Sequence, residues 1–304
     1  MGNKSSAWMI LVAAMLWGTT GTAQTFAPEG AHPVAIGAIR LAIGGFSLLL
    51  VLLLSGQFRR SNWPLKKTGI AALCMACFQP LFFSGVHLTG VAIGTVVGIG
   101  SAPVLSGFIE WMFFQKRPSN RWWLATVLSV LGCVLLFSHQ GAVRVDPSGV
   151  GLAMGAGLSF AIYSSVNKRL LNQHSPLSVV AVVFTLSAVL LSPLLFVYDM
   201  SWIFEKQGLF VSLHLGIMAT SVAYILFAKG LQSVPSSTAV TLSLAEPLTA
   251  SLLGVFVVGE RLSGLSWFGI VLLLLGLSWL TFPVRRRRPV SVDENTTISS
   301  HDRR

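Results

Sequence analysis

Long apolar stretches separated by short polar or charged segments run through almost the whole chain. Each stretch is about 20 residues long, which is the length that a helix needs to cross the hydrocarbon of a bilayer. The pattern predicts ten membrane-spanning helices. Their expected bounds are 6–26, 34–54, 68–88, 92–114, 122–140, 149–167, 177–197, 209–229, 237–258 and 264–282. The composition, with 53% hydrophobic and only 10% charged residues, is that of a polytopic membrane protein and excludes a soluble domain.

The chain also repeats itself at a lag of 144 residues, the distance from Pro103 to Pro247. The match joins the end of one apolar stretch, a short polar turn and the start of the next stretch. The residues of the first copy are Pro103, Arg117, Ser119, Trp123, Val127, Leu128, Leu131 and Gly132, and those of the second are Pro247, Arg261, Ser263, Trp267, Val271, Leu272, Leu275 and Gly276. Duplicated halves are how many membrane transporters form a binding site near the bilayer midplane.

The formal net charge of +11 could suggest a nucleic-acid partner, but the basic residues follow the loops. Cytoplasmic loops of membrane proteins are rich in Lys and Arg. With the N-terminus inside, the segments on the cytoplasmic side hold Lys4, Arg59, Arg60, Lys66, Lys67, Lys116, Arg117, Arg121, Lys168, Arg169, Arg285 to Arg288, Arg303 and Arg304. The opposite side has Arg144, Lys206 and Arg261. We therefore expect both termini in the cytoplasm, a multi-pass protein of the cell (inner) membrane and no nucleic-acid partner.

This topology predicts how the two copies are oriented. A half of five helices that enters from the cytoplasm must leave on the other side, so the second half runs upside down. The matched turns agree, since Lys116-Arg117 falls inside and Glu260-Arg261 outside. We therefore expect an all-α membrane protein of two inverted five-helix repeats, residues 1–143 and 144–283, followed by a disordered cytoplasmic tail, 284–304.

A search for catalytic chemistry finds little. The sequence has no nucleophile elbow, metalloprotease motif or phosphate-binding loop. Its cysteines, Cys74, Cys77 and Cys133, lie in expected spans without clustered histidines, which favours packing over a metal site. We expect neither an enzyme nor a bound metal or cofactor, so active transport would draw on an ion gradient or on the gradient of the substrate.

Polar residues inside a bilayer therefore become the candidate site, because a central acid costs about 2.5–3.5 kcal/mol to insert. Glu246 lies near the middle of its span, is followed by Pro247, and shares a small and polar helix face with Ala239, Ser243 and Ala250. Two interpretations stay open for Glu246. It lines a cavity or couples transport to protons, or it makes a structural contact with a neighbouring helix.

Other spans carry polar groups at helical spacing. Such groups fit a helix face that lines a water-accessible cavity, and they fit close packing between helices equally well. The candidate cavity residues are Trp17, Thr20, Gln24, Gln79, Tyr163, Asn167, Tyr224, Ser243 and Glu246. The candidate kinks are Pro80, Pro103 and Pro247. Arg40, in the outer third of its span, either snorkels or forms a salt bridge, or it is a cationic site for an anionic substrate. Glu110 is expected to pair with a basic residue.

Several motifs carry a family resemblance. They are Trp17-Gly18, Gly230-Leu231-Gln232-Ser233-Val234-Pro235-Ser236-Ser237-Thr238-Ala239, Ala245-Glu246-Pro247-Leu248-Thr249-Ala250, and Gly259-Glu260-Arg261-Leu262 followed by Trp267-x-Gly269. The chain resembles the EamA-type branch of the drug/metabolite transporter superfamily. This resemblance implies ten helices in two inverted repeats, a central cavity, and export of amino acids or other small metabolites by exchange with protons or down a gradient. The first copy departs from the pattern, because it has Ala102 at the position of Glu246. Any function of the Glu-Pro pair is therefore carried out by the second half alone.

The expected mechanism is alternating access around a cavity bounded by spans one, three, four, six, eight and nine. The expected partners are a small-molecule substrate, the lipid bilayer and protons as a candidate coupling ion. Spans five and ten are expected to form either the scaffold of the protein or the surface of a homodimer. Two alternatives remain. A nucleotide-sugar or organic-anion exchanger is disfavoured because Arg40 is the one cation deep in a span. A non-transporting membrane subunit is expected to lack a polar, water-accessible helix face.

Overall fold

The computed structural model describes residues 2–56, 63–138 and 146–282. Within these ranges ten helices are long and apolar enough to cross a membrane, which confirms the predicted number of spans. The predictions for the tail, 284–304, and for Arg59, Arg60 and Arg144 concern residues outside the described part of the chain. The helices of the first half are α1 (Gly2–Gln24), α2 (Pro33–Leu54), α3 (Leu65–Phe114) and α4 (Asn120–Phe137).

Helix α3 contains two spans, Leu65–Gly90 and Ile93–Phe113, which meet at Gly90. The backbone of Gly90 has φ +82°, a left-handed conformation that glycine adopts without strain. Several spans of the second half, in contrast, are made of more than one element. These elements are α5 (Pro147–Leu170), α6 (Pro176–Leu191), α7 (Leu194–Val197), η1 (Ser201–Phe204), α8 (Lys206–Leu213), the π-helical η2 (His214–Val222), α9 (Ala223–Leu231), α10 (Ser236–Leu242), α11 (Ala245–Leu253), the π-helical η3 (Gly254–Val258) and α12 (Gly264–Thr281).

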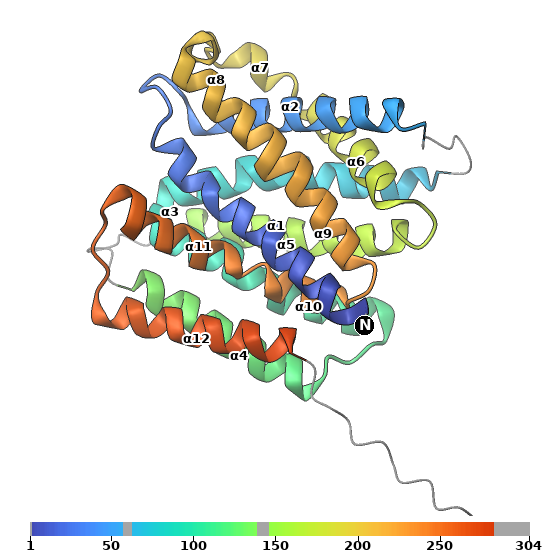
Figure 1. Ribbon diagram of the computed structural model, residues 1–304, viewed down its shortest axis with the longest axis vertical. Coiled ribbons are helices and arrows are strands. Elements are labelled where there is room, and N and C mark those ends of the chain that lie inside the picture. The colour runs from blue at the N-terminus through green and yellow to red at the C-terminus, as the bar shows by residue number, and fades with distance from the viewer. Residues whose placement is uncertain (1, 57–62, 139–145, 283–304) are drawn as a thin grey trace, which may run out of the picture.

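The packing of the helices is symmetric between the two halves. Helix α1 packs against α9 and α11, and its counterpart α5 packs against both spans of α3. Helix α2 contacts η2 as α6 contacts α3, while the pairs α2 with α6 and α4 with α12 each join equivalent helices of the two halves. Figure 1 shows α4 and α12 side by side at one edge of the bundle. Exchanging the halves therefore leaves the main set of helix contacts unchanged.

The contacts between α4 and α12 show that the repeat is inverted. A Cβ atom at Gly132 would lie 2.6 Å from the carbonyl oxygen of Gly269, and a Cβ atom at Gly276 would lie 2.8 Å from that of Ala125. The 144-residue lag converts the first pair into the second. Gly132 of α4 thus lies against Gly269 of α12, and Ala125, earlier in α4, lies against Gly276, later in α12. The two helices therefore run antiparallel, and their backbones come close because these glycines have no side chain. Two inverted five-helix repeats are thus confirmed.

The matched polar turn has a local structural reason. Ser119 and Ser263 are the N-cap residues of α4 and α12, and their hydroxyl oxygens accept hydrogen bonds from the backbone N–H of Trp122 (3.2 Å) and Ser266 (3.1 Å). Such a cap satisfies one of the N–H groups that the first helical turn leaves unpaired. The serine at this position of the repeat therefore caps the start of an equivalent helix in each half.

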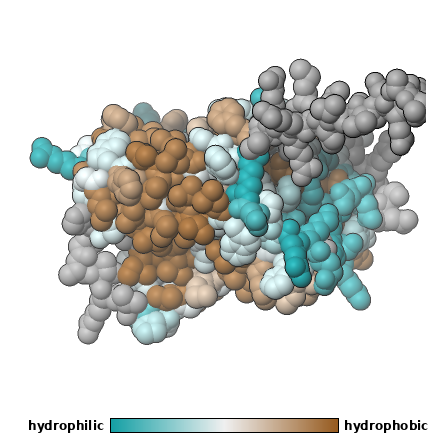
Figure 2. Space-filling model, turned by 90° about the horizontal axis from the view of Figure 1, so that it is seen from below, coloured by the Kyte–Doolittle hydropathy of each residue, from teal (hydrophilic) through white to brown (hydrophobic). Residues whose placement is uncertain are grey.

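The outer surface of this helix pair is apolar. Trp123, Val127, Leu131, Val271 and Leu275, all in the repeated segment, are exposed. Figure 2 shows this face as a broad hydrophobic area with most of the hydrophilic residues gathered toward one end. Acyl chains of the bilayer can cover such a face without cost, and a second copy of the chain could cover it as well, so both alternatives stay open for these residues.

The start of α1 and the end of α12 lie at the same end of the bundle, because Lys4 and Thr281 line one pocket there. We call this end the terminal end. An even number of spans requires this arrangement.

Candidate functional site

A cavity of about 40 Å³ lies between the two halves of the protein. Its lining comes from α1, α2, α3, α5, α9, α10 and α11, so both halves contribute. The lining residues are Trp17, Arg40, Phe78, Gly98, Ile99, Ala102, Phe160, Tyr224, Val240, Ser243 and Glu246. Spans one, three, four, six, eight and nine all take part, as the sequence predicted, and Arg40 adds span two. The volume is enough for water but small for a metabolite.

Glu246 is placed by an interruption of the ninth span. Pro247 has no N–H with which to bond the carbonyl oxygen of Ser243, and the backbone N–H of Glu246 donates to that oxygen instead (2.9 Å). The turn tightens, α10 ends at Leu242, and α11 begins at Ala245. The carboxylate of Glu246 therefore stands in the first turn of a new helix, where the helix dipole favours a negative charge.

The other two candidate kinks behave differently. Pro80 and Pro103 lie inside α3, whose only non-helical residue is Gly90. The helix continues past both prolines, so Pro247 is the one of the three candidates that accompanies a break in its span.

Arg40 is held inside the bundle by the π-helical segment η2. Its side chain is 8% exposed, and its guanidinium donates from Nε to Oγ1 of Thr220 (2.9 Å) and from Nη2 to the carbonyl oxygen of Ala219 (3.0 Å). The hydroxyl of Thr220 donates in turn to the carbonyl oxygen of Leu215, five residues earlier (2.8 Å). π-Helical turns often occur at functional sites. These bonds fix the guanidinium at the cavity wall, so Arg40 does not snorkel.

Arg40 and Glu246 face the same cavity without touching each other. In the described part of the chain no ion pair joins them, and no side-chain hydrogen bond is made by Glu246. Opposite charges in a low-dielectric interior attract strongly and are costly to leave unpaired. A ligand that carries one charge of each sign would satisfy both groups.

Aromatic rings form the remaining wall of the cavity. The ring of Trp17 lies 4.7 Å from that of Tyr224, 5.8 Å from that of Phe160 and 5.3 Å from that of Phe227, measured between centroids. The indole N–H of Trp17 is buried and has no hydrogen-bond partner. A buried N–H without an acceptor is rare, which makes this group available to a bound molecule.

The structure brings together four of the candidate residues, Trp17, Tyr224, Ser243 and Glu246, at the cavity. The other five do not line it, although the ring of Tyr163 packs against those of Phe160 and Tyr224. Gln79 is buried against Gly37 of α2, Asn167 donates to the hydroxyl of the fully buried Tyr163 (3.2 Å), Thr20 has a buried hydroxyl without a partner, and Gln24 is the last residue of α1.

Glu110 forms no direct salt bridge in the described part of the chain, but its carboxylate attracts the ammonium group of Lys168, which lies near it. Its carboxylate accepts a hydrogen bond from the backbone N–H of Ser237 (3.1 Å), at the start of α10. Glu110 therefore caps a helix, away from the cavity.

Two pairs of repeat-related positions line the cavity, Ile99 with Ser243 and Ala102 with Glu246. The first half supplies the apolar member of each pair and the second half the polar one. The sequence does not distinguish the apolar lining residues, such as Phe78 and Phe160, because an apolar residue in a spanning helix faces lipid as readily as it faces a cavity. The mismatch at the 144-residue lag does not single out Ile99, because neighbouring positions such as Val97 and Thr241 differ as well.

Two inverted helical halves, with a cavity lined by opposite charges between them, define a membrane transporter as the class of protein. The chain belongs to the EamA-like transporter family, which matches residues 4–138 and 147–282. The family thus covers both halves of the bundle.

Individual relatives agree with this assignment. The chain is 53% identical over 279 residues to the uncharacterized transporter YwfM of Bacillus subtilis (strain 168), covering 92% of this chain and 94% of the relative. It is 28% identical over 302 residues to the threonine/homoserine exporter RhtA of Escherichia coli (strain K12), covering 95% and 96% of the two chains. A solved crystal structure with 21% identity superposes with a TM-score of 0.79 over 92% of this chain and 99% of the other, a likeness of fold.

Proposed function

We propose that this transporter exports amino acids or similarly small zwitterionic metabolites by alternating access. The observation that carries the proposal is the pair Arg40 and Glu246, which line one cavity from different halves without an ion pair between them. An amino acid has a carboxylate and an ammonium group a few atoms apart. A guanidinium binds a carboxylate with two parallel hydrogen bonds, and a carboxylate accepts from an ammonium group.

The aromatic wall supports the same class of substrate. An ammonium group is attracted to the face of a Trp or Tyr ring, and Trp17 and Tyr224 stand beside Glu246 in the lining. The name of the relative RhtA, a threonine/homoserine exporter, points in the same direction. A nucleotide sugar fits less well, because its diphosphate would meet Glu246 as well as Arg40.

The cavity, at about 40 Å³, has to enlarge before a metabolite can enter. In an inverted-repeat transporter the halves rock against each other around a fixed site. Helices α1 and α11 are in direct contact beside Glu246, so a relative motion of these two helices would change the size of the cavity. Protonation of Glu246 is a candidate coupling event, since it would remove the charge that holds the ammonium group.

The charge distribution supports an orientation with both termini in the cytoplasm, in the cytoplasmic membrane of the cell. The terminal end of the bundle carries Lys4, Lys66, Arg117, Arg121 and Arg169, whereas Lys206 and Arg261 lie at the opposite end. This bias follows the positive-inside rule. Labelling of a single cysteine added beside Lys206, by a reagent that does not cross the membrane, tests it in intact cells.

The function is tested by efflux from proteoliposomes loaded with radiolabelled threonine, with a dicarboxylate as the comparison substrate. We expect efflux of threonine, and a reduction of about tenfold or more in Arg40→Gln and in Glu246→Gln, because each change removes a hydrogen bond to a charged group. Glu110→Gln is the matched control. It also neutralises an acid within a span, but its amide oxygen can still accept from Ser237 and it lies off the cavity.

The proposal fails if the dicarboxylate is transported and a panel of amino acids is not, or if Arg40→Gln and Glu246→Gln transport threonine as fast as Glu110→Gln. Coupling to protons is judged separately. Glu246→Gln should lose any change of efflux rate between about pH 6 and about pH 8, and an unchanged pH profile would exclude Glu246 as the proton-coupling group.

A further inference from the structure

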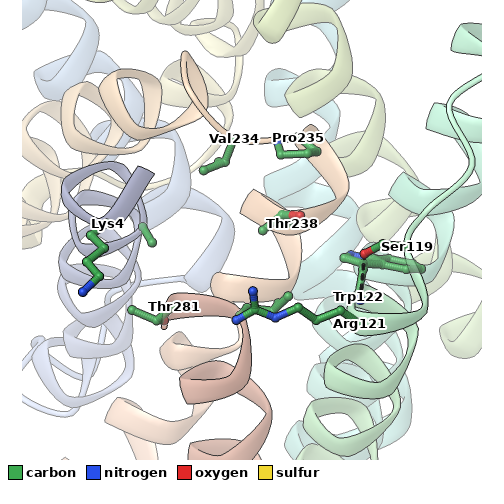
Figure 3. Close-up of a pocket in the computed structure, with 10 residues that line it drawn as sticks. Lys4, Ser119, Arg121, Trp122, Val234, Pro235, Thr238 and Thr281 are labelled. Carbon is green, nitrogen blue, oxygen red and sulfur yellow. Dashed lines mark hydrogen bonds between the residues drawn. The ribbon is translucent and has the colours of Figure 1, made fainter. Parts of the chain in front are cut away.

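A second pocket, of about 170 Å³, lies at the terminal end of the bundle. It is enclosed by the ends of four spans, those of α1, α4, α10 and α12 (Figure 3). The described residues that line it are Lys4, Ala7, Ser119, Arg121, Trp122, Val234, Pro235, Thr238, Leu280 and Thr281. Lys4 and Arg121 are basic, and none of this set is acidic, so the pocket favours an anion.

Arg121 is fixed in this pocket by the C-terminal end of α12. Its Nη2 donates to the backbone carbonyl oxygens of Trp279 and Phe282, which are among the acceptors that a helix leaves unpaired at its end. The Nε atom of the same guanidinium is buried and has no hydrogen-bond partner. The guanidinium is therefore oriented, with one donor unused.

Trp122 supplies a second unused donor. Its side chain is 2% exposed, and its indole N–H has no hydrogen-bond partner. In Figure 3 the indole nitrogen lies on the edge of the ring that is turned toward Thr238 and Arg121. The opposite edge of the ring is packed against Gly107. Buried donors are nearly always paired, so an acceptor in the pocket is expected.

The pocket lies at the level of the lipid headgroups. Trp123 and Trp279 flank it on α4 and α12, and both side chains are about half exposed. Tryptophan is enriched at the boundary between hydrocarbon and headgroups. Basic pockets between helix ends at this level are suited to anionic headgroups.

We propose that this pocket binds the headgroup phosphate of an anionic phospholipid. The phosphate accepts from the indole N–H of Trp122 and from the guanidinium of Arg121, and Lys4 neutralises its charge from α1. The acyl chains lie along the apolar outer face of α4 and α12. The bound lipid links the α4–α12 pair to α1 and α10, which also line the central cavity.

The test uses the purified full chain in detergent, with dioleoylphosphatidylglycerol or dioleoylphosphatidylcholine added in equal amounts and bound lipid measured by native mass spectrometry. We expect phosphatidylglycerol to be retained in preference to phosphatidylcholine. Lys4→Gln should weaken the retention about fivefold, the effect of about one basic contact at a membrane surface. Trp122→Phe should weaken it by a similar or larger factor, because it removes a hydrogen bond to a charged group. Lys66→Gln is the matched control, since it removes the same charge from the same end of the bundle, outside the pocket.

Equal retention of the two lipids would overturn the proposal, as would a loss in Lys66→Gln as large as in Lys4→Gln, which would mean a general surface-charge effect. Displacement of phosphatidylglycerol by millimolar inorganic phosphate would assign the pocket to a free anion instead. Lys4 is exposed, so its variant remains informative if Trp122→Phe does not fold. Lipid retention is measured without transport, so the result stands apart from the proposed substrate.

Discussion

Helix α1 closely approaches the Glu-Pro segment at Gly18, and this contact offers a test of the packing around the cavity. A Cβ atom at Gly18 would lie 2.6 Å from Cβ of Thr249, 2.7 Å from the carbonyl oxygen of Glu246 and 3.1 Å from the backbone nitrogen of Ala250. Two of these three atoms belong to the backbone of α11, which cannot rotate away as a side chain can. Gly18→Ala must therefore separate the two helices.

The size of the effect follows from these distances. Carbon atoms pack best at about 3.5–4.0 Å, so α1 has to withdraw from α11 by roughly 1 Å or distort locally. Extra methyl groups in a packed interior cost about 1–3 kcal/mol. We expect Gly18→Ala to lower the melting temperature in detergent by several degrees and to slow threonine efflux, because the displacement occurs beside Trp17 and Glu246.

Gly21→Ala is the matched control on the same helix. No atom lies within 4 Å of a Cβ atom at Gly21, so the added methyl group meets open space and alanine favours the helix by up to about 1 kcal/mol. Thermal unfolding followed by fluorescence, with efflux measured on the same preparations, compares the two variants. If Gly18→Ala matches Gly21→Ala in both measurements, the proposed contact between α1 and α11 is wrong.

Three further predictions follow from the repeat and the cavity. Gly132→Val should destabilise the protein by about 1–3 kcal/mol or more in thermal unfolding, because the backbone of Gly269 leaves no room for a side chain. Ser119→Ala and Ser263→Ala should each cost about 1 kcal/mol, since each removes a helix N-cap. Ser243→Cys, in a variant without the native cysteines, should react with a small methanethiosulfonate reagent and be protected by substrate, because Ser243 lines the cavity.

Each of these predictions has a control. Gly151→Val adds the same side chain at an exposed helical glycine with open space around it and should leave the melting temperature nearly unchanged. A stability loss confined to one of the two serine variants would contradict equivalent helix starts. Ala125→Cys lies in the α4–α12 contact and should not react, so equal labelling of Ser243→Cys and Ala125→Cys would contradict the cavity assignment.

The number of spans and the inverted repeat followed from the sequence alone. Both are visible directly in the sequence. A spanning helix needs a long apolar stretch, and the repeat retains N-cap, glycine and proline residues whose roles depend on local structure. Ser119 and Gly132 illustrate this, because a cap and a backbone contact each need a particular residue type. The side of the membrane on which the termini lie follows from charge bias alone and remains a prediction.

The residues that line the cavity could be predicted only in part from the sequence. Glu246 was identified because an acid and a proline stand out in an apolar span. Gln79 and Tyr163 carry the same polar signal but are buried in helix contacts, since a polar group in a spanning helix can be satisfied by a neighbouring helix as well as by a cavity. Phe160 lines the cavity and gives no signal, because lipid and cavity walls accept the same apolar side chains.

The sequence by itself thus determined a membrane protein of ten spans, its duplication and the inversion of its halves. The tertiary structure alone decided that Arg40 faces the same cavity as Glu246, since their common position depends on how α2, η2 and α11 pack together and not on any spacing along the chain. It also decided that Trp122 and Lys4 share a pocket. Spans far apart in sequence meet through side-chain packing, and hydrophobic periodicity does not encode which spans become neighbours.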